Sequence, residues 1–238
     1  MVGICDQVMA GLSCFPWNGS NCSVHDMATI LSNSWLSDFH INYVLSKISN
    51  HYGTKTSSRH IILPVFDLNS ITTAYKSTLP SGHTADKGKE LLEVENKIIC
   101  GLVDSVAGIL HLPNHWTSVI ISFNPPRILY GDSLKDPMPA KLASSFRRWI
   151  CHMLSRSGKT FQRLDISIFP LEITTQKDPN SCGLFALNSI NHHYLHNSPL
   201  LQSDILSLVH YRMEIALDLL QEGAVSLFLW KLSLVNID

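Results

Sequence analysis

Apolar residues recur every three to four positions in several stretches of the chain, and this spacing predicts amphipathic helices. The first helix is expected over residues 36–52, where Ser37 or Asp38 can cap the N-terminus and Gly53 can end the helix. The same spacing predicts further helices over residues 71–79, 87–97, 139–156, 183–195 and 203–221.

Two β-rich runs, residues 116–123 and 127–131, are separated by the turn sequence 124–126, which reads Asn-Pro-Pro, and together they predict a β-hairpin. Such a hairpin places the start of its first strand beside the end of its second. We therefore expect His115 and Asp132 to meet at one end of the ribbon. The register decides this, because a slip of one residue would put the two side chains on opposite faces.

Two further strands are predicted over residues 60–66 and 164–174. Pro64 favours a sheet edge for the first of these strands, and Pro170 favours an edge or a bulge for the second, because proline has no N–H to donate to a neighbouring strand. Residues 98–112 alternate apolar and small side chains and fit either a helix or a strand.

The chain has 238 residues, of which 45% are hydrophobic and 16% charged, and this composition suits one globular domain with a large core. We expect residues 1–33 to be a loosely structured lead-in and residues 34–238 to form that single domain. The net charge is −1, so neither a nucleic acid nor a membrane surface is an expected partner. The apolar run 224–230 ends at Lys231 and is too short to span a bilayer.

The cysteines are widely spread, and no secretory signal precedes them. This pattern favours free thiols in an intracellular protein, in the nucleus or the cytoplasm or both, over a disulfide framework. The cysteines are Cys5, Cys14, Cys22, Cys100, Cys151 and Cys182.

Cys182 differs from the other cysteines because it stands where a strand-like run gives way to a predicted helix. A helix N-terminus offers free N–H groups and a partial positive charge, which favour a thiolate over a thiol. Gly183 lets the backbone approach a substrate carbonyl closely, and the Cys182 N–H can hold an oxyanion. Gln176 can supply a second donor from its side-chain amide. Taken alone, this motif is equally compatible with a buried structural cysteine.

His115 and Asp132 supply the remaining parts of a thiol-based active site. His115 can act as a general base toward Cys182, and Asp132 can hold the imidazole in place. Each residue also has an ordinary interpretation, as a locally bonded histidine and as a turn aspartate. The order His, Asp, Gln, Cys and the predicted hairpin favour the catalytic interpretation.

Trp35 and Trp116 are candidates for the walls of a narrow slot, although most tryptophans are simply core residues. Trp116 adjoins His115, so its ring is expected near the reacting atoms. A slot with aromatic walls admits only residues without side chains. This hypothesis points to a glycine-rich substrate tail.

Together these pieces resemble the ubiquitin-like-protein-specific cysteine proteases, a family that includes the SUMO (sentrin) proteases and the deneddylases and is related to the adenovirus protease. The matching pieces span residues 34–200 in the order that the family has. They are Trp35-Leu36-Ser37-Asp38-Phe39-His40-Ile41-Asn42, His115-Trp116, Tyr130-Gly131-Asp132-Ser133-Leu134, and Gln176 followed by Ser181-Cys182-Gly183-Leu184-Phe185.

The resemblance implies a papain-like α+β cysteine protease fold, with a central mixed sheet flanked by helices and the nucleophile at the N-terminus of a buried helix. It also implies a catalytic triad of His115, Asp132 and Cys182, with Gln176 as the oxyanion donor.

The resemblance further implies that Trp35 and Trp116 clamp a Gly-Gly tail beside Gly183, while Asp38 contacts the body of the modifier. The implied activity is cleavage after the C-terminal Gly-Gly of a ubiquitin-like modifier, most of all a SUMO-like one, in precursor maturation or deconjugation. We expect a monomer with no cofactor and no metal.

Three features depart from the family's pattern. Ser181 stands where an acidic residue often precedes the cysteine, and Ser37 stands where the early motif has asparagine. Residues 67–112 have no clear match and are a candidate lineage-specific insertion. These departures bear on the substrate more than on the chemistry.

Other functions compete with this one. The first is a catalytically inactive relative that only binds the modifier, against which the complete triad argues. The second is a serine esterase, because residues 131–134 read Gly-Asp-Ser-Leu with Ser133 as nucleophile, but no Asp-x-x-His follows. Two groupings of metal-binding residue types lack the spacing of zinc sites, namely His192 with His196, and Cys14 with Cys22 and His25.

Overall fold

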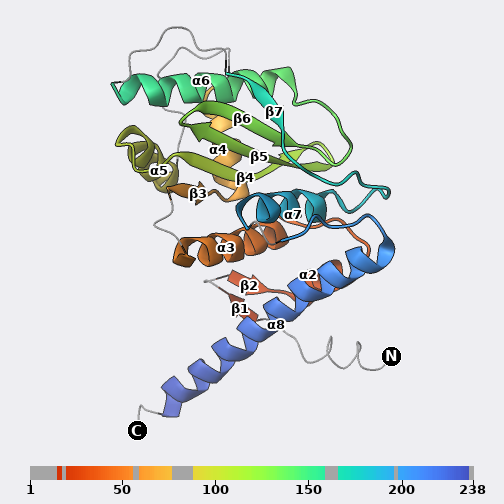
Figure 1. Ribbon diagram of the computed structural model, residues 1–238. Helices are drawn as coiled ribbons and strands as arrows, with labels where there is room; N and C mark the ends of the chain where they lie inside the picture. The colour runs from red at the N-terminus through yellow and green to blue at the C-terminus, as the bar shows by residue number, and fades with distance from the viewer. Residues whose placement is uncertain are drawn as a thin grey trace.

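A five-stranded mixed sheet forms the centre of the protein, in the order β3-β4-β5-β6-β7 (Figure 1). The computed structural model describes residues 15–17, 20–55, 59–76, 88–158, 166–195 and 198–235. The outer pairs β3–β4 and β6–β7 are parallel, whereas β4, β5 and β6 are antiparallel. The strands are β3 His60–Ile62, β4 Ser105–Leu112, β5 His115–Phe123, β6 Pro126–Gly131 and β7 Ile168–Pro170.

Helices cover both faces of this sheet, and each face has its own hydrophobic core. Helices α4, α5 and α6 pack on one face, and α7 packs on the other, followed by α3, α2 and α8. The helices are α2 Val24–Leu31, α3 Asp38–Lys55, α4 Val65–Ala74, α5 Lys89–Ile99, α6 Ala140–Arg156, α7 Cys182–Tyr194 and α8 Ile205–Val235. This architecture confirms the α+β fold with a central mixed sheet that the sequence predicted.

The predicted hairpin is confirmed as β5 and β6, which pair with Ser118 opposite Gly131. Side chains of β5 alternate between the two cores, with Trp116 and Ile120 facing α7 and Val119 and Ile121 facing α6. This alternation fixes the register, because a slip of one residue would exchange the two faces.

The ambiguous residues 98–112 contain the strand β4, which lies between β3 and β5. The segment 67–112, expected as an insertion, therefore carries a strand of the central sheet, and its helix α5 buries Leu91, Val94 and Ile98 in one core.

The strands predicted around Pro64 and Pro170 are both at sheet edges, as expected, but they are shorter than predicted. Pro64 directly precedes α4, which begins at Val65 rather than at residue 71. A proline at this point is compatible with a helix start, because the first turn leaves its N–H groups unpaired in any case.

The expectation of a loosely structured lead-in over residues 1–33 is wrong for its described part, which holds a small hairpin and helix α2. The hairpin strands are β1 Phe15–Trp17 and β2 Ser20–Cys22. Ser23 and Asp26 form a capping box at the start of α2, with the Asp26 N–H 3.1 Å from Ser23 Oγ and the Ser23 N–H 2.9 Å from Asp26 Oδ2. Met27 and Ile30 of this helix are buried in the core.

Helix α8 runs beyond the predicted end at residue 221 as far as Val235, and its C-terminal part extends away from the sheet at the lower left of Figure 1. Among the described residues, no helix combines the length and apolar character that crossing a membrane requires.

The described cysteines are free thiols, namely Cys22, Cys100, Cys151 and Cys182. The other two, Cys5 and Cys14, lie outside the described residues.

Candidate active site

Cys182 is the first residue of α7, and its side chain is buried, with 1% of the residue exposed. A tight turn leads into the helix, in which the Asn180 N–H donates to Asp178 Oδ1 at 2.8 Å. Helix α7 lies between the sheet and α3, and its residues 182–190 are all buried. The sulfur is therefore held at the N-terminal end of a rigid, buried helix.

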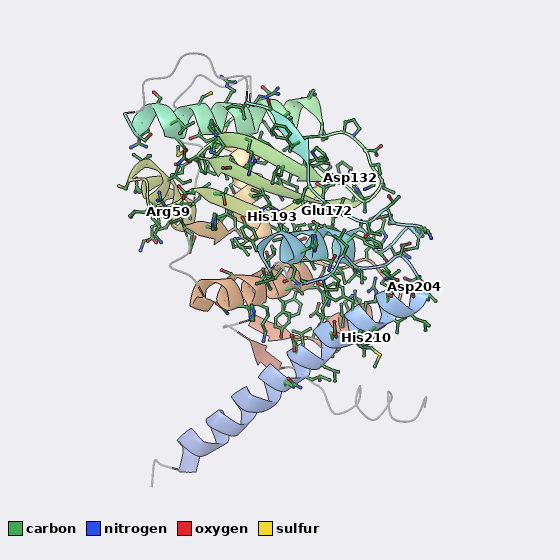
Figure 2. The ribbon with its side chains drawn as sticks, viewed as in Figure 1. Arg59, Asp132, Glu172, His193, Asp204 and His210 are labelled. Carbon is green, nitrogen blue, oxygen red and sulfur yellow. The ribbon has the colours of Figure 1, made fainter. Side chains whose placement is uncertain are left out.

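His115 begins β5, and its Nε2 atom lies 2.8 Å from Asp132 Oδ1. The pairing of Ser118 with Gly131 places Thr117 opposite Asp132, so His115 is the diagonal neighbour of Asp132 on the same face of the sheet. The predicted meeting of these two side chains is thus confirmed. Figure 2 shows Asp132 at the right-hand end of the sheet, above α7.

Cys182 lies close enough to the His115 imidazole to contribute to the shift of its pKa, so the structure brings the three predicted triad residues together. The pKa of His115 rises from 6.5 to about 9 because of the hydrogen bond to Asp132 and then the interaction with Cys182, although burial works in the opposite direction. Nε2 faces Asp132, which leaves Nδ1 for Cys182. An imidazolium at neutral pH can hold a thiolate as an ion pair.

Asp132 is itself held by two groups that the sequence did not single out for this role. The Leu134 N–H donates to Asp132 Oδ1 at 2.7 Å, and the Tyr130 hydroxyl donates to Asp132 Oδ2 at 3.3 Å. Asp132 is 5% exposed. Both carboxylate oxygens are therefore engaged, and the carboxylate is fixed toward His115.

Gln176 is buried in the loop before α7, and its side-chain amide makes two hydrogen bonds. Nε2 donates to the carbonyl of Asp178 at 2.9 Å, and Oε1 accepts from Ser133 Oγ at 2.5 Å. Ser133 is fully buried and bonds to Gln176 rather than to a histidine, which argues against its role as an esterase nucleophile.

The two tryptophans of the predicted slot are placed differently. Trp116 is buried, donates from Nε1 to the carbonyl of Leu36 at 3.0 Å, and stacks on His111 with ring centroids 4.3 Å apart. Trp35 is 37% exposed and donates from Nε1 to the carbonyl of Pro179 at 2.9 Å. One aromatic is thus part of the core, and the other lies on the surface over the loop before Cys182.

Gly183 follows the nucleophile and faces the buried tryptophan. A Cβ at this position would lie 3.2 Å from Ile41 Cδ1, 3.3 Å from Trp116 Cδ1 and 3.4 Å from Leu36 Cβ. The close packing at the start of α7 therefore depends on a residue without a side chain.

Asp38, the candidate contact for the modifier, is exposed as the first residue of α3.

Sequence reasoning missed the supports of the loop that carries Trp35. Arg212 of α8 is 4% exposed and donates to the carbonyls of Ser34 at 2.7 Å and Ile30 at 3.4 Å. Asn180 Nδ2 donates to the carbonyl of Asn33 at 2.8 Å and so ties this loop to the one before Cys182. No local sequence pattern could have revealed these contacts, which join residues more than 140 positions apart.

Over the described part of the chain, no group of three or more His, Cys, Asp or Glu side chains is arranged to hold a metal.

Comparisons with known proteins connect this site to one family. The family model of the Ulp1 protease family, C-terminal catalytic domain, matches residues 34–224. No curated protein sequence matches the chain.

Several solved structures share the fold. The SUMO protease Ulp1 with its catalytic cysteine oxidised to a sulfenic acid has a TM-score of 0.67 at 18% identity, covering 93% of this chain and 94% of that one. The Ulp1-like SUMO protease catalytic domain of Chaetomium thermophilum has a TM-score of 0.66 at 15% identity, covering 93% and 88%. The C-terminal Ulp1 protease domain in complex with SMT3, the yeast ortholog of SUMO, has a TM-score of 0.63 at 17% identity, covering 93% and 94%. The family model covers most of the chain and these structures share its fold, so the chain belongs to the Ulp1 protease family and carries that family's cysteine protease domain.

Proposed function

We propose that this protein is a thiol protease that cleaves after the C-terminal Gly-Gly of a ubiquitin-like modifier. The observation that carries the proposal is the position of the His115 imidazole, which is hydrogen-bonded to Asp132 at 2.8 Å and lies close enough to Cys182 for that side chain to raise its pKa. This arrangement provides a nucleophile, its base and an orienting carboxylate in one buried cluster.

In the proposed reaction, the Cys182 thiolate attacks the carbonyl carbon of the terminal glycine. The Cys182 N–H and the Gln176 amide stabilise the resulting oxyanion. The His115 imidazolium donates its proton to the leaving amine as the carbon–nitrogen bond breaks, which leaves a thioester. His115 then takes a proton from a water molecule that attacks the thioester, releasing the carboxylate and the free enzyme.

The surroundings of Cys182 support a substrate tail without side chains. Trp116 packs against Gly183 from inside the core, and Trp35 lies over the loop before Cys182 from outside. A Gly-Gly tail between these rings presents only its backbone, which suits recognition by steric exclusion. Asp38, exposed at the start of α3, is a candidate contact for the body of the modifier.

A SUMO-like modifier is the proposed substrate because the solved neighbours are SUMO proteases and one of them is bound to a SUMO ortholog. The reaction would serve precursor maturation, deconjugation or both, because the bond after Gly-Gly is broken in each case. We propose that the enzyme acts as a monomer in the nucleus, the cytoplasm or both.

A panel of modifier–fluorophore fusions tests this function. Purified protein is incubated with C-terminal fluorophore fusions of SUMO, ubiquitin and the neddylation modifier, and release of the fluorophore is followed. We expect the SUMO fusion to be hydrolysed fastest and the Cys182→Ala variant to release none. Binding of a modifier without hydrolysis of any fusion would instead support an inactive relative.

A further inference from the structure

The Ser133 hydroxyl is a buried polar group that directly follows Asp132 in the sequence, and the reaction outlined above does not use it. Ser133 is fully buried, so its hydroxyl has no solvent to bond and depends on a protein partner. That partner is Oε1 of Gln176, at 2.5 Å.

The partners of the Gln176 amide determine which way round it lies. The carbonyl of Asp178 can only accept a hydrogen bond, so the amide atom facing it at 2.9 Å must be Nε2. Oε1 then faces Ser133, whose hydroxyl must be the donor. A backbone bond from the Gln176 N–H to the Ser133 carbonyl at 3.0 Å holds the two residues together as well.

One N–H of the Gln176 side-chain amide has no hydrogen-bond partner assigned so far. Nε2 carries two hydrogens, and Asp178 takes one of them. Within the described part of the chain, Gln176 has no further side-chain partner, so the second hydrogen is free for a ligand. Without the Ser133 bond, only the Asp178 carbonyl would hold the amide, and rotation about its last torsion, which is broad in glutamine, could turn the remaining N–H away from the ligand.

We propose that Ser133 is a positioning residue, whose hydroxyl fixes the Gln176 amide with its remaining N–H available to the oxyanion formed at Cys182. This inference rests on the proposed function, because it assigns a role within the same reaction. It also accounts for the Gly-Asp-Ser-Leu sequence, in which the aspartate orients the base and the serine orients the oxyanion donor.

A double-mutant cycle tests the coupling of the two side chains. Removing a single oxyanion donor lowers kcat on the order of 100-fold or more, and we expect Gln176→Ala to do so. Ser133→Ala should lower kcat about 10-fold and leave KM within about 2-fold, because the amide is misdirected only part of the time. In the Gln176→Ala background, Ser133→Ala should cost less than about 2-fold more, since the group it positions is gone.

Two further measurements separate positioning from general damage. Alkylation of Cys182 by iodoacetamide needs no oxyanion, so its rate should be the same in wild type and Ser133→Ala. Ser145→Ala removes another buried hydroxyl, which bonds the Lys141 carbonyl in α6 at 3.2 Å, and should leave kcat unchanged. Ser133→Cys keeps a weak donor of similar size and should have a kcat between those of wild type and Ser133→Ala, which keeps the inference testable if the alanine variant does not fold.

The kinetic results distinguish the positioning role of Ser133 from the proposed protease function. Full activity in Ser133→Ala, or losses that multiply in the double variant, would overturn the positioning role while leaving the protease intact. A wild type that hydrolyses no modifier fusion would contradict the proposed function, and the positioning role would fall with it. Loss of hydrolysis in Ser133→Ala combined with full activity in Cys182→Ala would identify Ser133 as the nucleophile.

Discussion

Trp35 donates a hydrogen bond from its indole nitrogen to the carbonyl oxygen of Pro179 at 2.9 Å. The two residues are 144 positions apart in sequence, and the bond joins the loop before α3 to the loop that leads to Cys182. An exposed aromatic side chain is thereby held against the loop that leads to Cys182 rather than left free to rotate.

Replacing Trp35 by phenylalanine keeps a ring but removes this bond. A typical hydrogen bond contributes about 1 kcal/mol, so KM for a modifier fusion should rise roughly 3- to 10-fold while kcat changes little. Trp149→Phe is the matched control, because it removes an indole bond to Glu95 on the far side of the sheet and should lower stability without changing KM. A Trp35→Phe enzyme with unchanged KM would show that the bond does not contribute to substrate binding.

The raised pKa of His115 predicts the alkaline limit of activity. The imidazolium must protonate the leaving amine, so kcat/KM should fall as the pH rises through about 9. The hydrogen bond from the imidazole to Asp132 is the largest cause of the raised pKa, so Asp132→Asn should move this limit toward lower pH. Asp136→Asn, which removes an exposed carboxylate from the same loop, should leave the limit in place. Identical alkaline limits for wild type and Asp132→Asn would contradict the assignment.

The same pKa shift links stability to pH. Because the folded pKa lies above the ordinary value of 6.5, the protonated imidazole stabilises the fold fully below about pH 6.5, and this contribution disappears as the pH rises through about 9. Urea unfolding of wild type and Asp132→Asn should therefore give the largest difference in unfolding free energy near pH 6. A difference that stayed constant up to pH 9.5 would be inconsistent with the shift.

Gly183→Ala tests the packing at the start of α7. The added Cβ would lie 3.3 Å from Trp116 Cδ1, and the ring cannot easily move because its nitrogen bonds the Leu36 carbonyl. We expect kcat/KM to fall on the order of 10-fold because the start of α7, which carries Cys182, must shift instead of the ring, while the unfolding free energy changes by less than about 2 kcal/mol. Gly88→Ala, at the start of α5, meets only ordinary contacts at 3.5 and 3.8 Å and should leave kcat/KM unchanged. Normal turnover by Gly183→Ala would refute the steric argument.

The part of the site that the sequence predicted well is local. The hairpin that joins His115 to Asp132 follows from two β-rich runs and a proline turn, and its register follows from the alternation of core side chains. Cys182 could be placed at a helix start because the strand-like run and the apolar period lie on either side of it.

The parts that the sequence did not predict have two different causes. The capping box of Ser23 and Asp26 was readable, but the short helix after it was obscured by a polar, cysteine-containing neighbourhood. The bond from Arg212 to Ser34 could not be predicted, since it spans 178 positions and no periodicity connects a C-terminal helix to an N-terminal loop. Long-range contacts between side chains and backbone follow only from the folded chain.

Covalent capture of Cys182 tests the central claim most directly. Wild type and the Cys182→Ala variant are incubated with a SUMO carrying an electrophile in place of its C-terminal glycine, and the products are measured by intact mass. We predict one adduct per wild-type chain, located on Cys182, and none on the variant, whose melting temperature should match that of wild type. Equal labelling of the two proteins, or labelling at an exposed cysteine such as Cys100, would contradict the assignment of the nucleophile.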